Sequence, residues 1–445
     1  MMQPQNPHPF PSHYMPNTDS DREEMLRVVG ASTIDDLFVD IPEPYRNPTL
    51  DIPPPLSEIE LRAELATLAG KNIDAGRAGW FLGAGVYNHF VPSIVKPIIT
   101  RGEFLTSYTP YQAEASQGTL QYAYEFQTLI CNLMGMDVAN DGMYEGASSL
   151  AEAALMACRI TQREDIYVLD SVSPVYRKVL ETYALPQGLN VHTVSMTSVD
   201  LPEGAACLLA QYPNFFGYIE NLESYYEQTR KTGAMFVVST DPVAMGLFKS
   251  PGEYGADIVT GEGQGIGVPM SYGGPYVGLF CTRNQYVRQM PGRLVGRTVD
   301  QDGETGYVLT LQTREQHIRR ERATSNICTS QALLALATTI TLASLGRRGL
   351  RHVAELCYHK SHYAASVISR IPGYSLPMPG VFFKEMVIKC PENPDVINER
   401  LLEAGIVGGL NISEQIPNCM LLCFTEMNDR KQIEDLTNVL TEFSR

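Results

Sequence analysis

Residues 255–275 read GADIVTGEGQGIGVPMSYGGP, and this stretch indicates the kind of fold that surrounds it. It opens with an apolar run over residues 256–259, which is typical of a buried strand, and continues as a glycine-rich loop that ends in Gly-Gly-Pro. Upstream, AMFVVST is a second apolar run, and Asp241 follows it directly. Two successive buried strands that end in polar loops favour a parallel sheet whose loops carry the function.

Short apolar runs on either side extend this pattern. The runs IYVLD, NVHTV, ACLLAQYP and YVGLFC alternate with helical stretches such as VYRKVLETYA. The alternation predicts a large α/β domain over residues 75–345, with a mostly parallel sheet covered on both faces. The strands EMVIKC and NCMLLCFTE and a final helix predict a smaller α+β domain over residues 346–445. Residues 1–74 predict an extended arm with short helices, because segments such as YRNPTLDIPPPL cannot be helical.

Several helix ends are marked in the sequence. A short helix at DSDREEMLRVV should stop at Gly30, and QGTLQYAYEFQTLICNLM should stop at Gly135. Ser57 and Glu60 have the spacing of a capping box, which predicts a helix that begins there.

The composition argues against several classes of partner. The formal net charge is −16, whereas nucleic acids and anionic membranes bind basic surfaces. We therefore expect no nucleic acid and no membrane as a partner, and no apolar run is long enough to span a bilayer. The nine cysteines form no CxxC pair, which favours reduced thiols in a cytoplasmic protein and no metal site. The polar, proline-rich start MMQPQNPHPFPSHYMPNTDSD is not typical of a secretory signal.

The loop after the strand at residues 256–259 lacks a residue that many pyridoxal phosphate enzymes carry there. In those enzymes an Asp after one strand pairs with the pyridine nitrogen, and a Lys after the next strand forms a Schiff base. Asp241 stands in the first position, but residues 261–271 contain no Lys. Lys249 is the nearest lysine, and it precedes the strand, so we interpret it as a solvated side chain. The pattern leaves open an enzyme without its nucleophile, an enzyme of another kind, or half of a larger site.

A dense group of polar and aromatic side chains occurs in YTPYQAEASQG, which begins at Tyr108. The segment is either a surface loop before a capped helix or a loop that enters a polar pocket. We favour the pocket, because each buried polar group requires a partner and cores rarely contain so many.

Two further segments allow two interpretations each. Gly146, Ser148 and Ser149 precede a helix, where free N–H groups hold a phosphate or are simply capped. The run TREQHIRRER is most typical of a solvated helix face, but one of its arginines could instead bind a substrate carboxylate. These arginines are Arg314, Arg319, Arg320 and Arg322.

Several long segments are similar to one family. They are HYMPNTDSDREEML, SYTPYQAEASQGTLQYAYEFQTLICNLMGMDVAN, GADIVTGEGQGIGVPMSYGGPYVGLF, MPGRLVGRTVDQDGETGYVLTLQTREQHIRRERATSNICTSQALLAL and GVFFKEMVIKCP. Through them the chain resembles, from about residue 12 onward, the alpha chains (subunit 1) of glycine dehydrogenase (decarboxylating), the P-protein of the glycine cleavage system. In that family the Schiff-base Lys lies in the second of two homologous halves or chains. The resemblance therefore implies that this chain lacks the Lys. Gln264 or Gly265 stands roughly where the second subunit has it.

The resemblance also implies a fold and a site. The large domain should have the aspartate aminotransferase-like fold type I of pyridoxal phosphate enzymes. In the family the YTPYQAE segment belongs to the active-site region, and its candidate residues are Tyr108, Thr109, Tyr111, Gln112 and Glu114. ATSNI looks like the Thr-Pro-Asn-Ile element of related enzymes, whose Thr reaches a neighbouring subunit's cofactor phosphate. By that analogy Thr324 and Asn326 bind cofactor in trans, and the alternative is that Thr324 caps a helix beginning near Ser325.

The implied function is that of the non-lysine subunit of glycine dehydrogenase (aminomethyl-transferring, decarboxylating). With subunit 2 (beta), it would decarboxylate glycine through pyridoxal phosphate held covalently by that subunit. It would pass the aminomethyl group to the lipoyl arm of the H-protein, as part of a cytoplasmic α2β2 assembly. The alternative is a catalytically silent scaffold that stabilises the lysine-bearing subunit. An independent decarboxylase that uses one of the chain's own lysines is the weaker hypothesis, because none lies in the expected loop.

Overall fold

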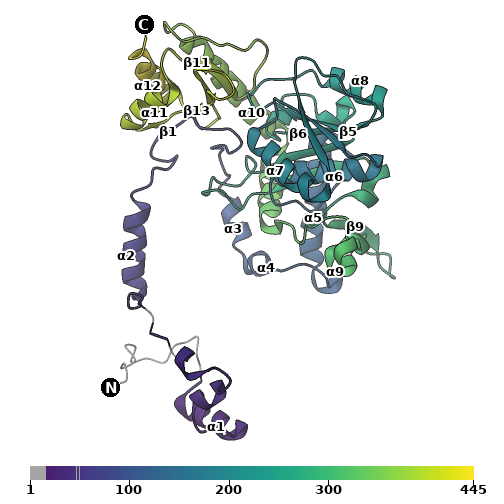
Figure 1. Cartoon of the computed structure of the whole chain (residues 1–445), viewed down its shortest axis with the longest axis vertical. Coiled ribbons are helices and arrows are strands. Elements are labelled where there is room, and N and C mark those ends of the chain that lie inside the picture. The colour runs from purple at the N-terminus through teal and green to yellow at the C-terminus, as the bar shows by residue number, and fades with distance from the viewer. Residues whose placement is uncertain (1–16, 47, 50, 445) are drawn as a thin grey trace. The chain divides into compact units, whose positions relative to one another are not determined.

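The computed structural model of the chain describes residues 17–46, 48–49 and 51–444 (Figure 1). The predicted start of the arm, residues 1–16, lies outside these ranges. The chain divides into two compact units, which meet in sequence between Asn72 and Ile73. Among the described helices, none is long and apolar enough to cross a membrane.

The N-terminal unit consists of short helices without a core of their own. The capping box and the Gly30 stop predicted from the sequence are confirmed: Ser57 caps α2, and Gly30 ends α1 with a φ of 75°. None of the residues in these helical segments is buried. Their bounds are α1 Asp19–Val29, η1 Ile34–Phe38, η2 Glu43–Tyr45 and α2 Glu58–Ala69.

The second unit contains a seven-stranded sheet in the order β2-β8-β7-β6-β5-β3-β4. Strands β7, β6, β5, β3 and β4 run parallel to one another, whereas β8 pairs antiparallel with both β7 and β2. The predicted mostly parallel α/β sheet is therefore confirmed. The strand bounds are β2 Val138–Ala139, β3 Asp165–Leu169, β4 Asn190–Val194, β5 Ala205–Tyr212, β6 Met235–Thr240, β7 Ile258–Glu262 and β8 Gly278–Thr282.

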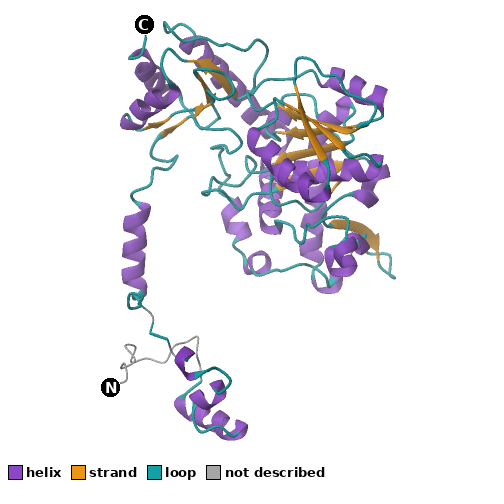
Figure 2. Cartoon of the chain, viewed as in Figure 1, coloured by secondary structure: helices purple, strands orange, loops and turns teal. Residues whose placement is uncertain are grey.

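Helices pack around this sheet (Figure 2). The alanine-rich α6 is almost wholly buried, because its small side chains allow close approach to the sheet. The long helix α5 ends at Gly135 as predicted, with a φ of 68°. The bounds are α5 Gln117–Met134, α6 Gly146–Thr161, α7 Pro174–Ala184, α8 Leu222–Thr232 and α10 Ala332–Ile368.

Helix α10 connects the two main hydrophobic clusters. Gly346 interrupts it with a φ of 58° and a ψ of −177°, values that suit glycine far better than a residue with a side chain. Beyond this kink, Leu350 packs in the cluster under the large sheet, and Ile368 packs in the cluster of the C-terminal strands. The predicted domain limits at residues 74 and 345 stay predictions.

The C-terminal strands form an antiparallel sheet in the order β11-β14-β13. The short strand β1 pairs with β12 in parallel, so residues 79–80 join the segment around residue 406. The bounds are β1 Gly79–Trp80, β11 Glu385–Lys389, α11 Pro394–Glu403, β12 Ile406–Val407, β13 Leu410–Asn411, β14 Cys419–Cys423 and α12 Arg430–Thr441.

A β-hairpin and several short helices carry the loops that matter for the candidate site. The hairpin pairs β9 Leu294–Val299 with β10 Thr305–Thr310. The short helices are α3 Val95–Ile99, α4 Gly102–Leu105 and α9 Gln316–Arg319. The helix expected near Ser325 is wrong: residues 323–331 are not helical, and α10 begins at Ala332.

Candidate active site

Two neighbouring parallel strands bring acidic residues together at one edge of the sheet. Strand β6 ends at Thr240 and β7 ends at Glu262, and their register pairs Thr240 with Gly261. Asp241 therefore leaves the sheet beside Glu262. Open α/β sheets bind their ligands at the carboxyl ends of their strands, so this edge is the first place to look for a site.

The Asp241 carboxylate is paired with an ammonium group of the same chain. Lys384, immediately before β11, places its Nζ 2.6 Å from Asp241 Oδ2, and its side chain is 2% exposed. Burial alone would lower the pKa of Lys384, but the facing Asp241 carboxylate, together with Cys423 and Cys357, outweighs burial and the pKa is raised. The carboxylate that would pair with a pyridine nitrogen is thus occupied by a charged lysine.

Gln264 lies in the loop after β7 and is fully committed to hydrogen bonds. Its Oε1 accepts from the Tyr87 N–H at 2.9 Å, and its Nε2 donates to the carbonyls of Tyr87 and Val268, both at 2.9 Å. The residue is 1% exposed. Lys249 is exposed, and its Nζ lies over the ring of Tyr254. It therefore does not take the place of the missing lysine in this loop.

Carboxylates cap the start of α6. Glu145 accepts from the N–H groups of Ala147 and Ser148 at 2.7 and 3.0 Å, and Glu262 accepts from the Gly146 N–H at 2.9 Å. The Ser148 and Ser149 hydroxyls donate to the Glu145 carbonyl. Burial raises the pKa of Glu262 to about 7, although hydrogen bonds from the N–H groups of Gly146 and Gln264 oppose the shift. Of the two sequence interpretations, the capped helix describes this segment.

Little space remains at the strand ends. The cavity beside Asp241 and Glu262 has a volume of about 30 Å³, with Tyr87 and Tyr176 among its lining residues. This volume holds only a few water molecules, whereas ligand sites measure hundreds of Å³.

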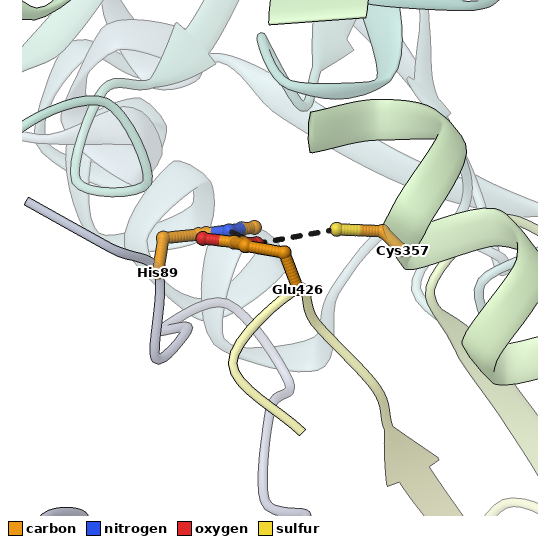
Figure 3. A group of neighbouring side chains, drawn as sticks. All are labelled: His89, Cys357 and Glu426. Atoms are coloured by element: carbon orange, nitrogen blue, oxygen red, sulfur yellow. Dashed lines mark hydrogen bonds and ion pairs between the residues drawn. The ribbon is translucent and has the colours of Figure 1, made fainter. Parts of the chain in front are cut away.

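The Asp241–Lys384 pair continues into a buried chain of hydrogen bonds. Lys384 Nζ lies 2.9 Å from His89 Nε2, and His89 Nδ1 lies 2.7 Å from Glu426 Oε2. The Cys357 thiol donates to the same Glu426 oxygen at 3.4 Å (Figure 3). Burial would raise the pKa of Glu426, but His89 and the Phe90 N–H lower it to about 2. The chain joins the end of β6 to β11, α10 and the segment after β14.

The ligand atoms of His89, Cys357 and Glu426 lie within 4.8 Å of one another, as in a metal site. The Lys384 ammonium can only donate, so His89 accepts at Nε2 and carries its hydrogen on Nδ1. A metal at Nδ1 would move that hydrogen to Nε2, where it would face the ammonium. A second-shell partner of a metal-bound His is normally an acceptor. The arrangement therefore suits a hydrogen-bond chain rather than a cation.

The predicted loop at residues 108–114 lies elsewhere, at the surface beside the β9–β10 hairpin. Gln117 fixes its end, since the Gln117 amide exchanges two hydrogen bonds of 2.9 Å with the Tyr307 backbone. Tyr108 is 86% exposed, and Gln112 and Glu114 are also exposed. The side chains of Tyr108, Thr109, Gln112 and Glu114 make no hydrogen bond to any described residue.

Tyr111 is the exception in this loop, because it lies against a buried arginine. The Arg293 guanidinium donates to its hydroxyl at 3.4 Å, and Arg293 Cζ lies 5.7 Å from its ring centroid. The ring of His317 lies 5.4 Å from that of Tyr111. Arg293 also donates to the Cys328 carbonyl at 2.9 Å and to Thr329 Oγ1 at 3.2 Å.

The candidate residues Thr324 and Asn326 lie beside a cavity of about 490 Å³, with Glu152 and Arg159 in its wall. The Thr324 N–H donates to the Arg314 carbonyl at 3.0 Å, and Asn326 Oδ1 accepts from Gln316 Nε2 at 3.2 Å. The Thr324 hydroxyl has no hydrogen-bond partner among the described residues. Neither residue lines the small cavity at the strand ends.

The arginines of the TREQHIRRER run divide into two kinds. Arg314 is buried, and its guanidinium donates to the carbonyls of Leu311, Met290 and Gly292, so it is not free to bind a carboxylate. Arg319, Arg320 and Arg322 are exposed, as expected of a solvated face.

Sequence reasoning missed Arg293, which joins the two candidate loops. The available signal was a single charged residue between apolar neighbours in MPGRLV, a pattern that indicates a buried charge with fixed partners. The Lys384 pairing gave no local signal, because its partner lies far away along the chain.

Comparisons with known proteins agree with this architecture. The family described as glycine cleavage system P-protein matches residues 12–440. A probable glycine dehydrogenase (decarboxylating) subunit 1 from Thermomicrobium roseum is 49% identical over 96% of this chain and 99% of the relative. The corresponding protein from Chlorobium limicola is 48% identical over 96% and 99%.

Solved structures give the same result. The crystal structure of an inhibitor-bound glycine decarboxylase (P-protein) superposes with a TM-score of 0.92 at 41% identity, covering 97% of this chain and all of that one. A Burkholderia pseudomallei sphingosine-1-phosphate lyase superposes with a TM-score of 0.62 at 15% identity over 90% of this chain and 94% of that one, which shows the fold alone.

The sheet, its strand-end edge and these neighbours define a chain with the fold type I architecture of pyridoxal phosphate enzymes. Within that class, the chain belongs to the glycine cleavage system P-protein family and corresponds to its subunit 1.

Pyridoxal phosphate does not fit the strand-end site of this chain. Lys384 occupies the carboxylate that would meet the ring nitrogen, and Glu145 and Glu262 occupy the N–H groups that would meet the phosphate. Gln264 supplies a neutral amide where a lysine amine is needed. Each place that the cofactor requires is therefore taken by a side chain of the protein itself.

Proposed function

We propose that this chain is the non-lysine subunit of a glycine decarboxylase and completes an active site that its partner, subunit 2, carries. The closed strand-end site is the observation that carries this proposal. A chain of this family that cannot bind the cofactor itself contributes to decarboxylation by supplying residues to another chain. The lysine-bearing subunit would hold pyridoxal phosphate covalently, and that group would supply the electron sink that decarboxylation of glycine requires.

Two surface segments of this chain would supply those residues. Tyr108, Thr109, Tyr111, Gln112 and Glu114 belong to the first segment, and the second contains Thr324 and Asn326. In the proposed complex, the Tyr111 hydroxyl orients the substrate. The unpartnered Thr324 hydroxyl donates to the phosphate of the partner's cofactor, and Asn326 fixes the same loop.

The remaining parts of the proposal follow from the family. The aminomethyl group passes to the lipoyl arm of the H-protein, and two copies of each subunit form an α2β2 assembly. We place this assembly in the cytoplasm, because all nine cysteines are free thiols.

Substitution of Thr324 separates this proposal from a catalytically silent scaffold. A hydroxyl that donates to a phosphate makes a charge-assisted hydrogen bond, worth about 1.5–3 kcal/mol. Thr324→Ala should therefore weaken pyridoxal phosphate binding by the assembled complex roughly 10- to 100-fold. Thr324→Ser keeps the hydroxyl and should largely preserve the affinity.

The measurement is a spectroscopic titration of the apo complex with pyridoxal phosphate. If the dissociation constants of Thr324→Ala and the wild type agree, Thr324 does not contact the cofactor and the scaffold function gains support.

A further inference from the structure

Arg293 contacts three segments that lie far apart in the sequence. Its Nη2 donates to the Tyr111 hydroxyl at 3.4 Å and to the Cys328 carbonyl at 2.9 Å, and its Nη1 donates to Thr329 Oγ1 at 3.2 Å. The third segment supplies Glu315, whose Oε2 lies 3.5 Å from Arg293 Nε. One guanidinium therefore ties the 108–114 loop to the 324–329 segment.

The surroundings fix the direction in which this guanidinium points. The side chains of Arg293 and Glu315 are 7% and 8% exposed, so both charges are largely removed from water. Arg293 Nε and Glu315 Oε2 lie 3.5 Å apart but do not form a hydrogen bond, and Arg293 Nε has no acceptor among the described residues. Glu315 thus balances the charge, while the directed hydrogen bonds all go to the two loops.

Arg314 reinforces this arrangement from the other side. The Arg314 guanidinium donates to the carbonyls of Met290 and Gly292, in the segment that leads into Arg293. The Arg314 carbonyl accepts a hydrogen bond from the Thr324 N–H. The 324–329 segment is therefore held at its start by the Arg314 backbone and at its end by the Arg293 side chain. Arginine suits this role because its planar group presents several donors in fixed directions, which a lysine ammonium cannot do.

We propose that Arg293 is the positioning residue that holds Tyr111 and the 324–329 segment in one arrangement for the partner's active site. The inference rests on the proposed function, since it assumes that both loops act in trans. Direct binding of a substrate carboxylate by Arg293 is the competing role. The geometry disfavours it, because Arg293 is 6% exposed and its Nη donors are already engaged.

The test uses the complex of this chain with its lysine-bearing partner, assayed for exchange of labelled bicarbonate into glycine. Small misplacements of active-site groups cost up to about 100-fold in rate, so Arg293→Met should lower kcat roughly 10- to 100-fold while the glycine KM changes little. Arg293→Lys keeps the charge facing Glu315 and should preserve the melting temperature better than it preserves kcat.

A double-mutant cycle with Tyr111→Ala shows whether Arg293 acts through that loop. If it does, the kcat loss caused by Arg293→Met shrinks once Tyr111 is absent. Arg283→Met is the control, because the Arg283 guanidinium likewise makes three hydrogen bonds, all of them to backbone carbonyls, those of Ala256, Gly252 and Gly135. We expect the control to lower the melting temperature and leave kcat unchanged.

Four results would overturn the role of Arg293. Arg293→Met could leave kcat unchanged, or raise the glycine KM at constant kcat. The kcat loss caused by Arg293→Met could be equal with and without Tyr111, or Arg283→Met could lower kcat as much as Arg293→Met does. The wild-type complex keeps the two proposals apart. An inactive wild-type complex would contradict the proposed function, whereas an active one with an unaffected Arg293→Met contradicts only the positioning role.

Discussion

Gln264 carries a neutral amide, which cannot attack the aldehyde of a cofactor as a lysine amine does. Its three hydrogen bonds instead join the loop after β7 to the backbone around Tyr87. The absence of a lysine at this position was visible in the sequence, because the flanking strands are marked by local apolar runs. The side chains that close the site were not predictable, since Lys384 reaches Asp241 only through tertiary folding.

Asp141 is a buried carboxyl whose ionisation should be visible in the stability of the fold. Burial raises its pKa from 3.8 to about 7, and the hydrogen bond from Ser330 offsets only part of that shift. The unfolded chain therefore loses this proton at lower pH than the folded chain. The stability that protonated Asp141 contributes is complete below about pH 4 and is lost as the pH rises to about 7.

We predict that Asp141→Asn removes this part of the pH dependence. Between about pH 4 and pH 7.5 the free energy of unfolding of the variant should rise, relative to wild type, by roughly 1–4 kcal/mol. Urea unfolding of both proteins across this range measures the difference. A difference that stays constant with pH would show that Asp141 has no raised pKa in the folded chain.

The strands β6 and β11 are joined through the Asp241–Lys384 pair, and Lys384 also donates to His89. Removing one partner of a buried pair leaves the other charge without compensation, at a cost of about 3–5 kcal/mol. We therefore predict that Lys384→Met lowers the free energy of unfolding by about this amount. Adding Asp241→Asn to Lys384→Met should recover part of the loss, because it removes the unpaired charge.

Chemical denaturation of the single and double variants measures this coupling. Lys431→Met is a suitable control, because Lys431 pairs with Asp435 on the exposed face of α12 and should leave the unfolding midpoint unchanged. Equal effects of Lys384→Met and Lys431→Met would mean that the pair does not join the two strands.

Elements with local signals were predicted well, and elements set by distant contacts were not. The ends of α1 and α5 carry Gly30 and Gly135, and α2 begins with a capping box, so their limits follow from neighbouring residues. The pairing of β1 with β12 joins residues that are far apart in the chain and left no local trace. The helix expected near Ser325 failed, and the Thr324 N–H there donates to the distant Arg314 carbonyl, a contact that leaves no local signal.

The N-terminal unit exposes many apolar side chains that its own helices do not cover. Leu61, Leu65 and Leu68 of α2 are 46%, 54% and 50% exposed. We predict that the arm at residues 1–56 and this helix form part of an interface with the partner subunit, of roughly 2,000 Å² or more in total. Deletion of residues 1–56, or Leu61→Ser with Leu65→Ser, should weaken assembly.

Size-exclusion chromatography of the mixed subunits measures this effect. Glu64→Gln on the same helix provides the control, since it changes a charge without removing apolar area. Unchanged co-elution of the truncated chain with its partner would contradict an interface through this unit.

The protein as a whole could be placed in its family from long sequence segments, and its fold followed from the alternation of strands and helices. The polar cluster of the 108–114 loop singled that loop out, whereas Thr324 and Asn326 were singled out only by the resemblance, and the role of both segments stays a prediction. The sequence did not predict how the loops are held, since Arg293 donates to the Cys328 backbone carbonyl as well as to side chains. Backbone acceptors are present at every residue and leave no mark on the sequence.

We predict that this chain is inactive alone and completes its partner's active site. The most direct measurement is exchange of labelled bicarbonate into glycine, in the presence of pyridoxal phosphate and H-protein, by each purified subunit and by their mixture. We predict activity in the mixture and none in this chain alone, because Gln264 and Lys384 close its own site. Exchange catalysed by the isolated chain, or full exchange by the partner without it, would contradict the account.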